Sequence, residues 1–191
     1  IHNRPIYIKS LIPLKIKLVL YFHNDPVSMI GSKTVQERID LLNTCTKIIF
    51  NSEWSKKQFL KDLISFYHKS KKLEVIHQSI NKRKINFKSK EKLITFVGKL
   101  NSAKGFDIFG NAVIKILDKY PDWKSLIIGD EPRENISFSH KNLKNLGFQN
   151  HKKVLETFSK TSIAVACSRW EEPFGRTSLE AASRGCAVII S

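Results

Sequence analysis

Short apolar runs alternate with amphipathic segments along most of the 191 residues, and this alternation constrains the fold more than any other feature. Each run has the length of a buried strand, and most are followed by a loop and then by apolar residues at helical spacing. This order is typical of parallel α/β units. We expect strands at 16–22, 47–50, 73–77, 93–98 and 123–128, and helices at 32–43, capped by Ser32, at 53–66, and from 106 onward.

The stretch 162–190 predicts a buried strand, a loop, a short helix and a second strand. Pro173 and Gly175 shape the loop. Leu179, Ala182 and Ala181 are expected to face the sheet. In an open parallel sheet, ligands bind outside the carboxyl ends of the strands, so the loop and the start of the helix are candidate binding elements.

Two carboxylates enter this region, Glu172 from the loop and Glu180 from the helix, with seven residues between them. The free N–H groups at the helix start, from Phe174 through Gly175 to Thr177, favour an anion such as phosphate. Carboxylates do not favour phosphate, but they accept hydrogen bonds from vicinal hydroxyls. A sugar nucleotide offers both an anion and hydroxyls. The alternative is a surface loop with two solvated glutamates.

A second candidate loop, 98–105, follows a predicted strand and precedes a predicted helix. Gly98 and Gly105 let the backbone approach a ligand closely, and Lys99 and Lys104 supply positive charge for phosphate. The alternative is an ordinary connection between a strand and a helix.

The residues 171–185, Glu-Glu-Pro-Phe-Gly-Arg-Thr-Ser-Leu-Glu-Ala-Ala-Ser-Arg-Gly, resemble the donor-binding signature of retaining glycosyltransferases of family 4, which have the GT-B fold. The resemblance extends over nearly the whole chain. It implies an α/β protein with two Rossmann-like, doubly wound domains, both incomplete, in an internal fragment that lacks both ends. Residues 1–80 would be the C-terminal part of the N-terminal, acceptor-side domain, 81–92 a linker, and 93–191 a truncated donor-nucleotide-binding domain.

The resemblance also implies residue roles. Lys104 matches a family lysine that holds the donor diphosphate, and Lys99 stands where relatives carry arginine. Glu172 would hold hydroxyls of the donor sugar and Glu180 the ribose, beside Gly98, Phe174, Gly175 and Thr177. The run Tyr-Phe-His-Asn-Asp-Pro places His23 where a family histidine reaches the donor sugar, so His23 and Glu172 are the candidate catalytic residues. Arg4 and Asn24 are weaker candidates on the acceptor side, and a structural role is the alternative for His23 and Arg4.

The implied reaction moves a hexose from a nucleotide-diphosphate sugar to a hydroxyl on a glycan or lipid-linked acceptor, with retained configuration. No cofactor or metal is expected, because lysines and a helix N-terminus would carry the leaving charge. The fragment alone is expected to be inactive. The competing interpretations are another GT-B enzyme, such as a sugar-nucleotide epimerase, and a basic nucleic-acid-binding module, although no aromatic stacking motif lies on a basic strand.

The net charge of +16 is uneven, because residues 1–92 hold 19 Lys and Arg against 7 Asp and Glu. This excess favours polyanions or simply solvates the surface. We expect no nucleic-acid partner but a possible anionic membrane surface, as in lipopolysaccharide synthesis, with a cytoplasmic or peripheral location at the inner face of the membrane. The three cysteines show no metal or disulfide spacing. The basic cluster of the first half comprises Lys56, Lys57, Lys61, Lys69, Lys71 and Lys72.

Overall fold

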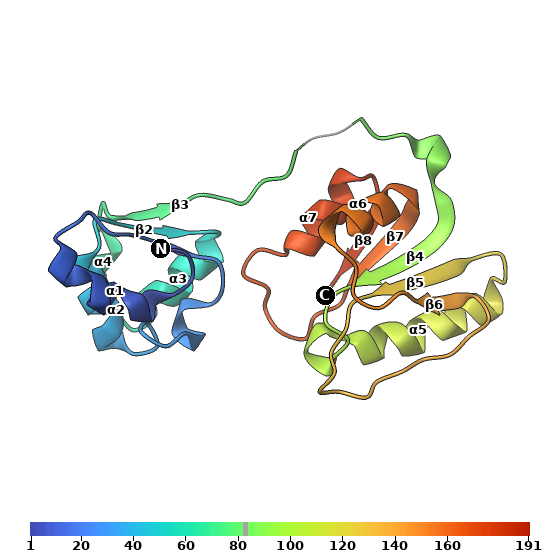
Figure 1. Ribbon diagram of the computed structural model, residues 1–191, viewed down its shortest axis with the longest axis horizontal. Helices are drawn as coiled ribbons and strands as arrows, with labels where there is room; N and C mark the ends of the chain where they lie inside the picture. The colour runs from blue at the N-terminus through green and yellow to red at the C-terminus, as the bar shows by residue number, and fades with distance from the viewer. Residues whose placement is uncertain (82–83) are drawn as a thin grey trace. The chain divides into compact units, whose positions relative to one another are not determined.

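A computed structural model describes residues 1–81 and 84–191 and confirms a parallel α/β fold with two sheets (Figure 1). The chain divides into two compact units. The first comprises 1–79 together with 172–174, and the second comprises 80–171 and 175–191. The predicted linker 81–92 includes residues 82 and 83, which lie outside the described residues, and the predicted domain boundaries stay a prediction.

In the described part of the first unit, three parallel strands form a sheet in the order β1-β2-β3. The rings of Phe22, Phe50 and Phe59 meet in its core, with centroids 5.3–5.7 Å apart. The strands are β1 (Val19–Phe22), β2 (Lys47–Phe50) and β3 (Leu73–Val75), and the helices are α1 (Ile8–Leu11), α2 (Val35–Thr44), α3 (Glu53–Leu60) and α4 (Ser65–His68).

Two helix predictions in this unit are corrected. Thr34, not Ser32, caps α2, because Thr34 and Glu37 form a capping box in which each side chain accepts from the other residue's backbone. The Ser32 side chain is buried and donates to the carbonyl of Pro26. The predicted helix 53–66 is two helices, because Asp62 adopts a positive φ of 64° between α3 and α4.

The second unit holds, among its described residues, a five-stranded sheet in the order β6-β5-β4-β7-β8, in which every neighbouring pair is parallel. β4 starts two residues before the predicted Leu93. The strands are β4 (Glu91–Val97), β5 (Lys124–Ile128), β6 (Leu143–Asn145), β7 (Thr161–Ala166) and β8 (Ala187–Ile190), and the helices are α5 (Phe106–Lys119), α6 (His151–Lys160) and α7 (Arg176–Ser183).

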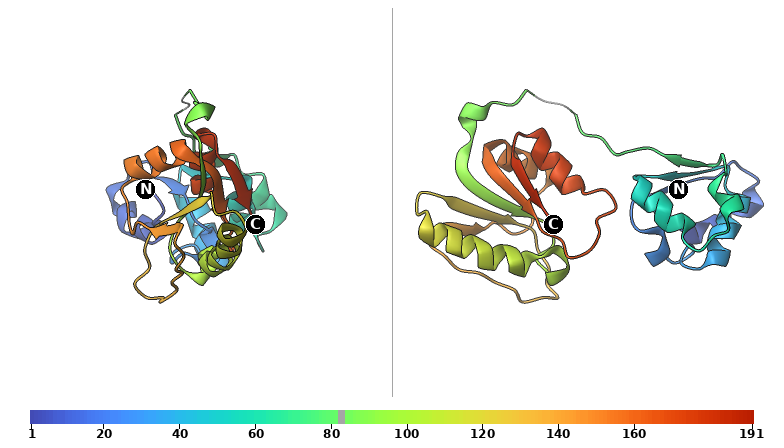
Figure 2. Two further views of the ribbon diagram at one scale, coloured as in Figure 1. Left: turned by 90° about the vertical axis from the view of Figure 1, so that its right-hand side faces the viewer. Right: turned by 180° about the vertical axis from the view of Figure 1, so that it is seen from behind.

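Helices cover both faces of this sheet (Figures 1 and 2). α5 packs on one face, where Phe106, Phe109 and Val113 join the buried side chains of β4. α6 and α7 pack on the other face, where Val154 and Ala181 share a second apolar cluster. Ala181 is buried while Ala182 is exposed, so the predicted sheet-facing role of Ala182 is wrong. A sheet covered on both faces explains why its strands are almost continuously apolar.

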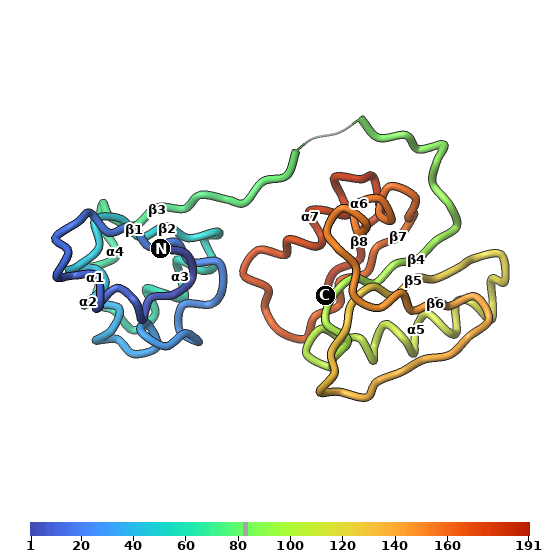
Figure 3. Tube along the Cα trace, viewed as in Figure 1, coloured from blue at the N-terminus to red at the C-terminus, as the bar shows by residue number. Residues whose placement is uncertain are grey.

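The strand order reverses direction at β4. From β4 the chain moves outward through β5 to β6 and then returns to the other side of β4 with β7 and β8. Such a reversal is the topological switch point of a doubly wound sheet, where ligands bind beyond the carboxyl ends of the strands. The loops after β4 and after β7 both leave the sheet at this point (Figure 3).

Candidate functional site

The loop after β4 carries Lys104 and is shaped by two close backbone approaches. Gly105 has a φ of 69°, and a Cβ there would lie 1.9 Å from the carbonyl oxygen of Cys167. Gly129, at the end of β5, has a φ of 145°, and its Cβ would lie 1.8 Å from the carbonyl oxygen of Gly98. Both positions therefore require glycine. The contact with Cys167 brings this loop against the segment that follows β7.

Lys104 ends a short 3₁₀ turn, Ser102–Lys104, that the Asn101 side chain caps by accepting from the Lys104 amide at 3.0 Å. The Lys104 ammonium lies over the ring of Trp170, 5.0 Å from its centroid. This is a cation–π contact between the lysine and the face of the indole ring. Sequence reasoning identified Lys104 but missed Trp170, although that indole lies in the same motif as Glu172.

Lys99 has a carboxylate neighbour that the sequence pattern did not reveal. Its Nζ lies 3.9 Å from an oxygen of Glu131, which follows β5. The Arg133 guanidinium donates to both Glu131 oxygens, at 2.6 and 2.9 Å. These bonds lower the pKa of Glu131 to about 2, so the carboxyl is ionised at neutral pH. The positive charge of Lys99 is thus partly balanced.

Gly175 begins α7 in the left-handed conformation, with a φ of 74°. The next turn carries Thr177, which lines a crevice together with Val97 and Ala166, the last residues of β4 and β7. The start of α7 therefore lies at the carboxyl ends of both strands, where the sequence placed it. The first amides of such a helix favour an anion.

Glu180 lies one turn further along α7 and is buried, with 7% of its surface exposed. One of its oxygens accepts from Arg176 at 2.9 Å and lies 3.1 Å from Nε2 of His151, the first residue of α6. A buried carboxylate needs such partners to remain charged. Sequence reasoning named Glu180 but neither partner. Arg176 is four residues away on the same helix, a spacing that could have indicated the pair.

His23 belongs to the first unit and ends β1 within a set of polar side chains. Its Nδ1 lies 2.8 Å from the Gln78 amide nitrogen, and its Nε2 lies 3.0 Å from Nδ1 of His2. The Asn3 side chain accepts from the backbone N–H groups of His23 and Asn24. The imidazole is therefore held in one orientation, and sequence reasoning did not name Gln78 or His2 as its partners.

The structure groups the predicted site residues in two sets. Gly98, Lys99, Lys104, Gly175, Thr177 and Glu180 all belong to the second unit, around its switch point. The other set belongs to the first unit and comprises Arg4, His23, Asn24, Glu172 and Phe174. Arg4 is exposed and donates to the carbonyl of Asn3.

Within residues 1–81 and 84–191, no three His, Cys, Asp or Glu side chains gather where they could hold a metal ion. None of the helices in the described part of the chain is both long enough and apolar enough to cross a membrane.

A doubly wound sheet with lysines and a helix N-terminus at its switch point is typical of proteins that bind nucleotides. A family model described as "Glycosyl transferases group 1" matches residues 77–191, more than half of the chain. The chain therefore belongs to the group 1 glycosyl transferases.

Individual relatives are distant. An uncharacterized glycosyltransferase of Methanocaldococcus jannaschii is 30% identical over 144 residues, which cover 63% of this chain and 36% of the relative. The lipopolysaccharide core biosynthesis mannosyltransferase LpsB of Rhizobium meliloti is 26% identical over 119 residues, covering 56% and 33%. The chain spans about a third of the length of these curated relatives.

Solved structures confirm the fold. The crystal structure of HepE from Anabaena, in complex with UDP-glucose, matches with a TM-score of 0.74 and 16% identity, covering 97% of this chain and 56% of that one. At this identity the likeness establishes the architecture, which is the predicted GT-B α/β fold with two parallel sheets.

Proposed function

We propose that this chain is part of a retaining glycosyltransferase of family 4, which moves a hexose from a nucleotide-diphosphate sugar to a hydroxyl acceptor. Membership of the group 1 glycosyl transferases supports a transferase. The similar HepE structure holds UDP-glucose, which supports a nucleotide sugar as the donor. The motif around Glu172 and Glu180 supports family 4.

One observation carries the proposal. The loop with Lys104 and the segment that leads to Gly175 lie against each other at the switch point, joined by the backbone bond from Arg169 N–H to the carbonyl of Ala103 at 2.9 Å. A lysine and a helix N-terminus are thus both available to one bound diphosphate.

Catalysis in this proposal is mainly electrostatic. The Lys104 ammonium and the first amides of α7 stabilise the negative charge of the diphosphate as it leaves. Lys99 contributes less, because Glu131 lies 3.9 Å from its ammonium and is itself ionised. Two cationic groups and a helix N-terminus need no metal to carry the leaving charge.

The carboxylates and His23 orient the sugar nucleotide. Glu180 accepts from the ribose hydroxyls, since Arg176 and His151 hold its carboxylate in one position. Glu172 accepts from hydroxyls of the donor sugar. His23, held by its contact with Gln78, positions the same sugar.

The remaining predicted residues have supporting roles. Gly98, Phe174, Gly175 and Thr177 shape the donor site. Arg4 and Asn24 contribute on the acceptor side.

The acceptor is proposed to be a glycan or lipid-linked hydroxyl used in cell-surface glycan or lipopolysaccharide synthesis. The relative from Rhizobium meliloti is a mannosyltransferase of lipopolysaccharide core biosynthesis. The uneven positive charge of the chain would favour those acceptors that carry phosphate groups.

The direct test is calorimetric binding of UDP, GDP and ADP, and of their sugar conjugates, to the purified protein. Lys104→Ala should weaken the best nucleotide about 10- to 100-fold, because a charge-assisted contact contributes about 1.5–3 kcal/mol. Lys115→Ala is the matched control, since Lys115 is an exposed lysine of the adjacent helix α5. Unchanged affinity in Lys104→Ala would remove the central residue of the proposal.

A peripheral membrane contact is proposed for the segment that contains α4. Ile64 and Phe66 are 68% and 76% exposed, and the nearby Lys61, Lys69 and Lys71 are exposed as well. Apolar side chains flanked by lysines are typical of segments that dock on anionic lipid surfaces. We propose a cytoplasmic location, at the inner face of the cell membrane.

Two other lysines of the predicted basic cluster are less available. The ammonium of Lys72 donates to the carbonyl of Leu42 at 2.7 Å, near the end of α2, and Lys56 is half-buried. Sedimentation with phosphatidylcholine vesicles, with and without phosphatidylglycerol, tests the contact. Binding should need the anionic lipid and fall in Phe66→Ser but persist in Ile30→Ser, a control at a residue 75% exposed elsewhere in this unit. Equal recovery with both kinds of vesicle would argue against the contact.

A further inference from the structure

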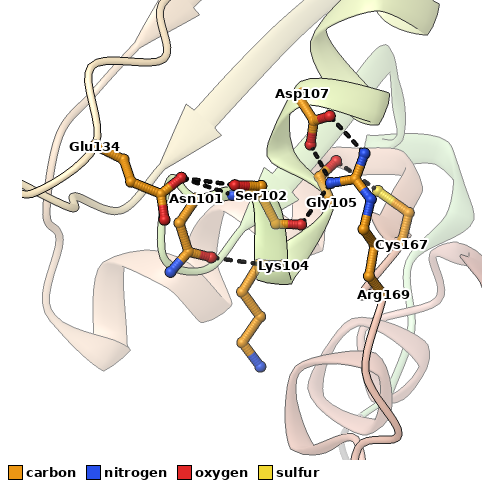
Figure 4. Close-up of polar contacts among 8 residues, drawn as sticks. All are labelled: Asn101, Ser102, Lys104, Gly105, Asp107, Glu134, Cys167 and Arg169. Atoms are coloured by element: carbon orange, nitrogen blue, oxygen red, sulfur yellow. Dashed lines mark hydrogen bonds and ion pairs between the residues drawn. The ribbon is translucent and has the colours of Figure 1, made fainter.

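Arg169, three residues after β7, connects the two loops of the donor site. Its guanidinium forms a bidentate pair with Asp107 in the first turn of α5, at 2.6 and 2.5 Å. The same guanidinium donates to the carbonyl of Ser102 at 2.6 Å (Figure 4). Its backbone N–H donates to the carbonyl of Ala103. Arg169 therefore binds the turn Ser102–Lys104 through both its side chain and its backbone.

Other contacts complete a frame around this turn. From the opposite side, the Glu134 carboxylate accepts from the Ser102 amide at 3.0 Å and from its hydroxyl at 2.8 Å. The Cys167 thiol donates to the carbonyl of Gly105 at 3.2 Å. The Lys104 side chain points away from these contacts (Figure 4), and its ammonium lies over the ring of Trp170. The backbone of the turn is thus fixed while its ammonium points outward.

We propose that Arg169 is a positioning residue that sets the place of Lys104 for the diphosphate, so that the loops after β4 and β7 act as one binding element. The inference rests on the proposed function of Lys104.

Geometry explains why arginine stands here. A planar guanidinium binds both oxygens of Asp107 through a rigid fork and also donates to a backbone carbonyl, whereas the ammonium of a lysine has no such fork. The contact with Arg169 also holds the pKa of Asp107 below its usual range, so the pair persists at neutral pH. The Arg169 and Asp107 side chains are 44% and 33% exposed. Such exposed pairs contribute little to folding, so replacing Arg169 should leave the fold intact.

The experiment measures nucleotide affinity and hydrogen exchange in the same variants. Arg169→Gln and Asp107→Asn should each weaken the nucleoside diphosphate that wild type binds best, among UDP, GDP and ADP, about 10-fold. Both should speed exchange of the amides from Ser102 to Gly105 without ligand. Lys92→Gln is the control, because Lys92 forms an exposed ion pair with Asp122 away from these loops. It should change neither quantity.

Two further variants separate positioning from general destabilisation. Arg169→Lys keeps the positive charge but not the planar fork. Its nucleotide affinity should therefore fall almost as far as that of Arg169→Gln. In the double variant Arg169→Gln with Lys104→Ala, affinity should fall little below that of Lys104→Ala alone, because Arg169 acts through Lys104.

Three results would overturn the inference, and they can be told apart. If Arg169→Gln binds like wild type, the positioning role falls and the proposed function stands. Losses that add in full in the double variant also overturn the positioning role. If wild type binds no nucleoside diphosphate, the proposed function and the inference fall together.

Discussion

Lys90 lies where two helices of the second unit end, and replacing it with methionine should destabilise that unit. Its ammonium donates to the carbonyls of Phe158, Thr161 and Arg184, at 2.9, 2.7 and 2.7 Å. The first two belong to the end of α6 and the third to the end of α7. The last carbonyls of a helix lack partners within the helix and carry partial negative charge. The Lys90 side chain therefore caps the C-terminal ends of both helices.

The size of the effect follows from these contacts. A hydrogen bond to a charged group contributes about 1.5–3 kcal/mol, so three together give about 5–9 kcal/mol before desolvation. Burial lowers the pKa of Lys90, which shows that desolvation opposes the charged form. Removing an ion from water costs several kcal/mol. We expect a net loss of about 2–4 kcal/mol for Lys90→Met, because methionine keeps the packing of the apolar stem.

Lys92→Met is the control for this variant, since the exposed ion pair of Lys92 with Asp122 should contribute little to stability. Urea unfolding should be followed by hydrogen exchange in peptides from β4 and β7, so that the second unit is measured by itself. If Lys90→Met and Lys92→Met differ by less than about 0.5 kcal/mol, the three carbonyl contacts do not stabilise the unit and the reasoning is refuted.

Three further predictions concern single side chains. Gly110→Ala should cost about 1–3 kcal/mol in urea unfolding, because its Cβ would lie 2.0–2.4 Å from the ring of Phe138; additive losses with Phe138→Ala would contradict this clash. The pKa of Glu131 is lowered to about 2 by Arg133, so the folded protein binds fewer protons than the unfolded chain. The stabilisation from this pair should be fully present above about pH 4.5 and lost as the pH falls toward 2. Glu131→Gln should therefore flatten the dependence of the free energy of unfolding on pH in this range, and an unchanged slope would count against the pair. Burial raises the pKa of Cys45 to about 11, so iodoacetamide at pH 8 should label this thiol only after unfolding, and rapid labelling of the folded protein would exclude a buried thiol.

Features that depend on neighbouring residues could be predicted from the sequence. Apolar runs located the strands, and glycine with lysine located the loop that carries Lys104. The true cap of α2 was also readable, because Thr34 and Glu37 have the spacing of a capping box. The choice of Ser32 overlooked this spacing. The Ser32 hydroxyl instead donates to the carbonyl of Pro26.

Features that depend on strand order could not be predicted. Arg169 and Asp107 are 62 residues apart, and they meet only because β7 returns to lie beside β4. The contact of Lys90 with Arg184 spans 94 residues and has the same origin. Charged residues are common in this chain, so no local pattern marks which of its lysines and arginines close a helix or hold a loop.

The same strand order explains why the donor site can combine functions that no single segment of the chain supplies. β4 leads into a loop with lysine, and β7 leads into a loop that ends at a helix N-terminus. Parallel pairing places the carboxyl ends of both strands at one edge, so the loop that carries Lys104 and the loop that leads to α7 leave the sheet from the same edge. A register slip between β4 and β7 would separate them. The bond between Arg169 and Asp107 joins the segment after β7 to the helix after β4, next to the place where the diphosphate is proposed to bind.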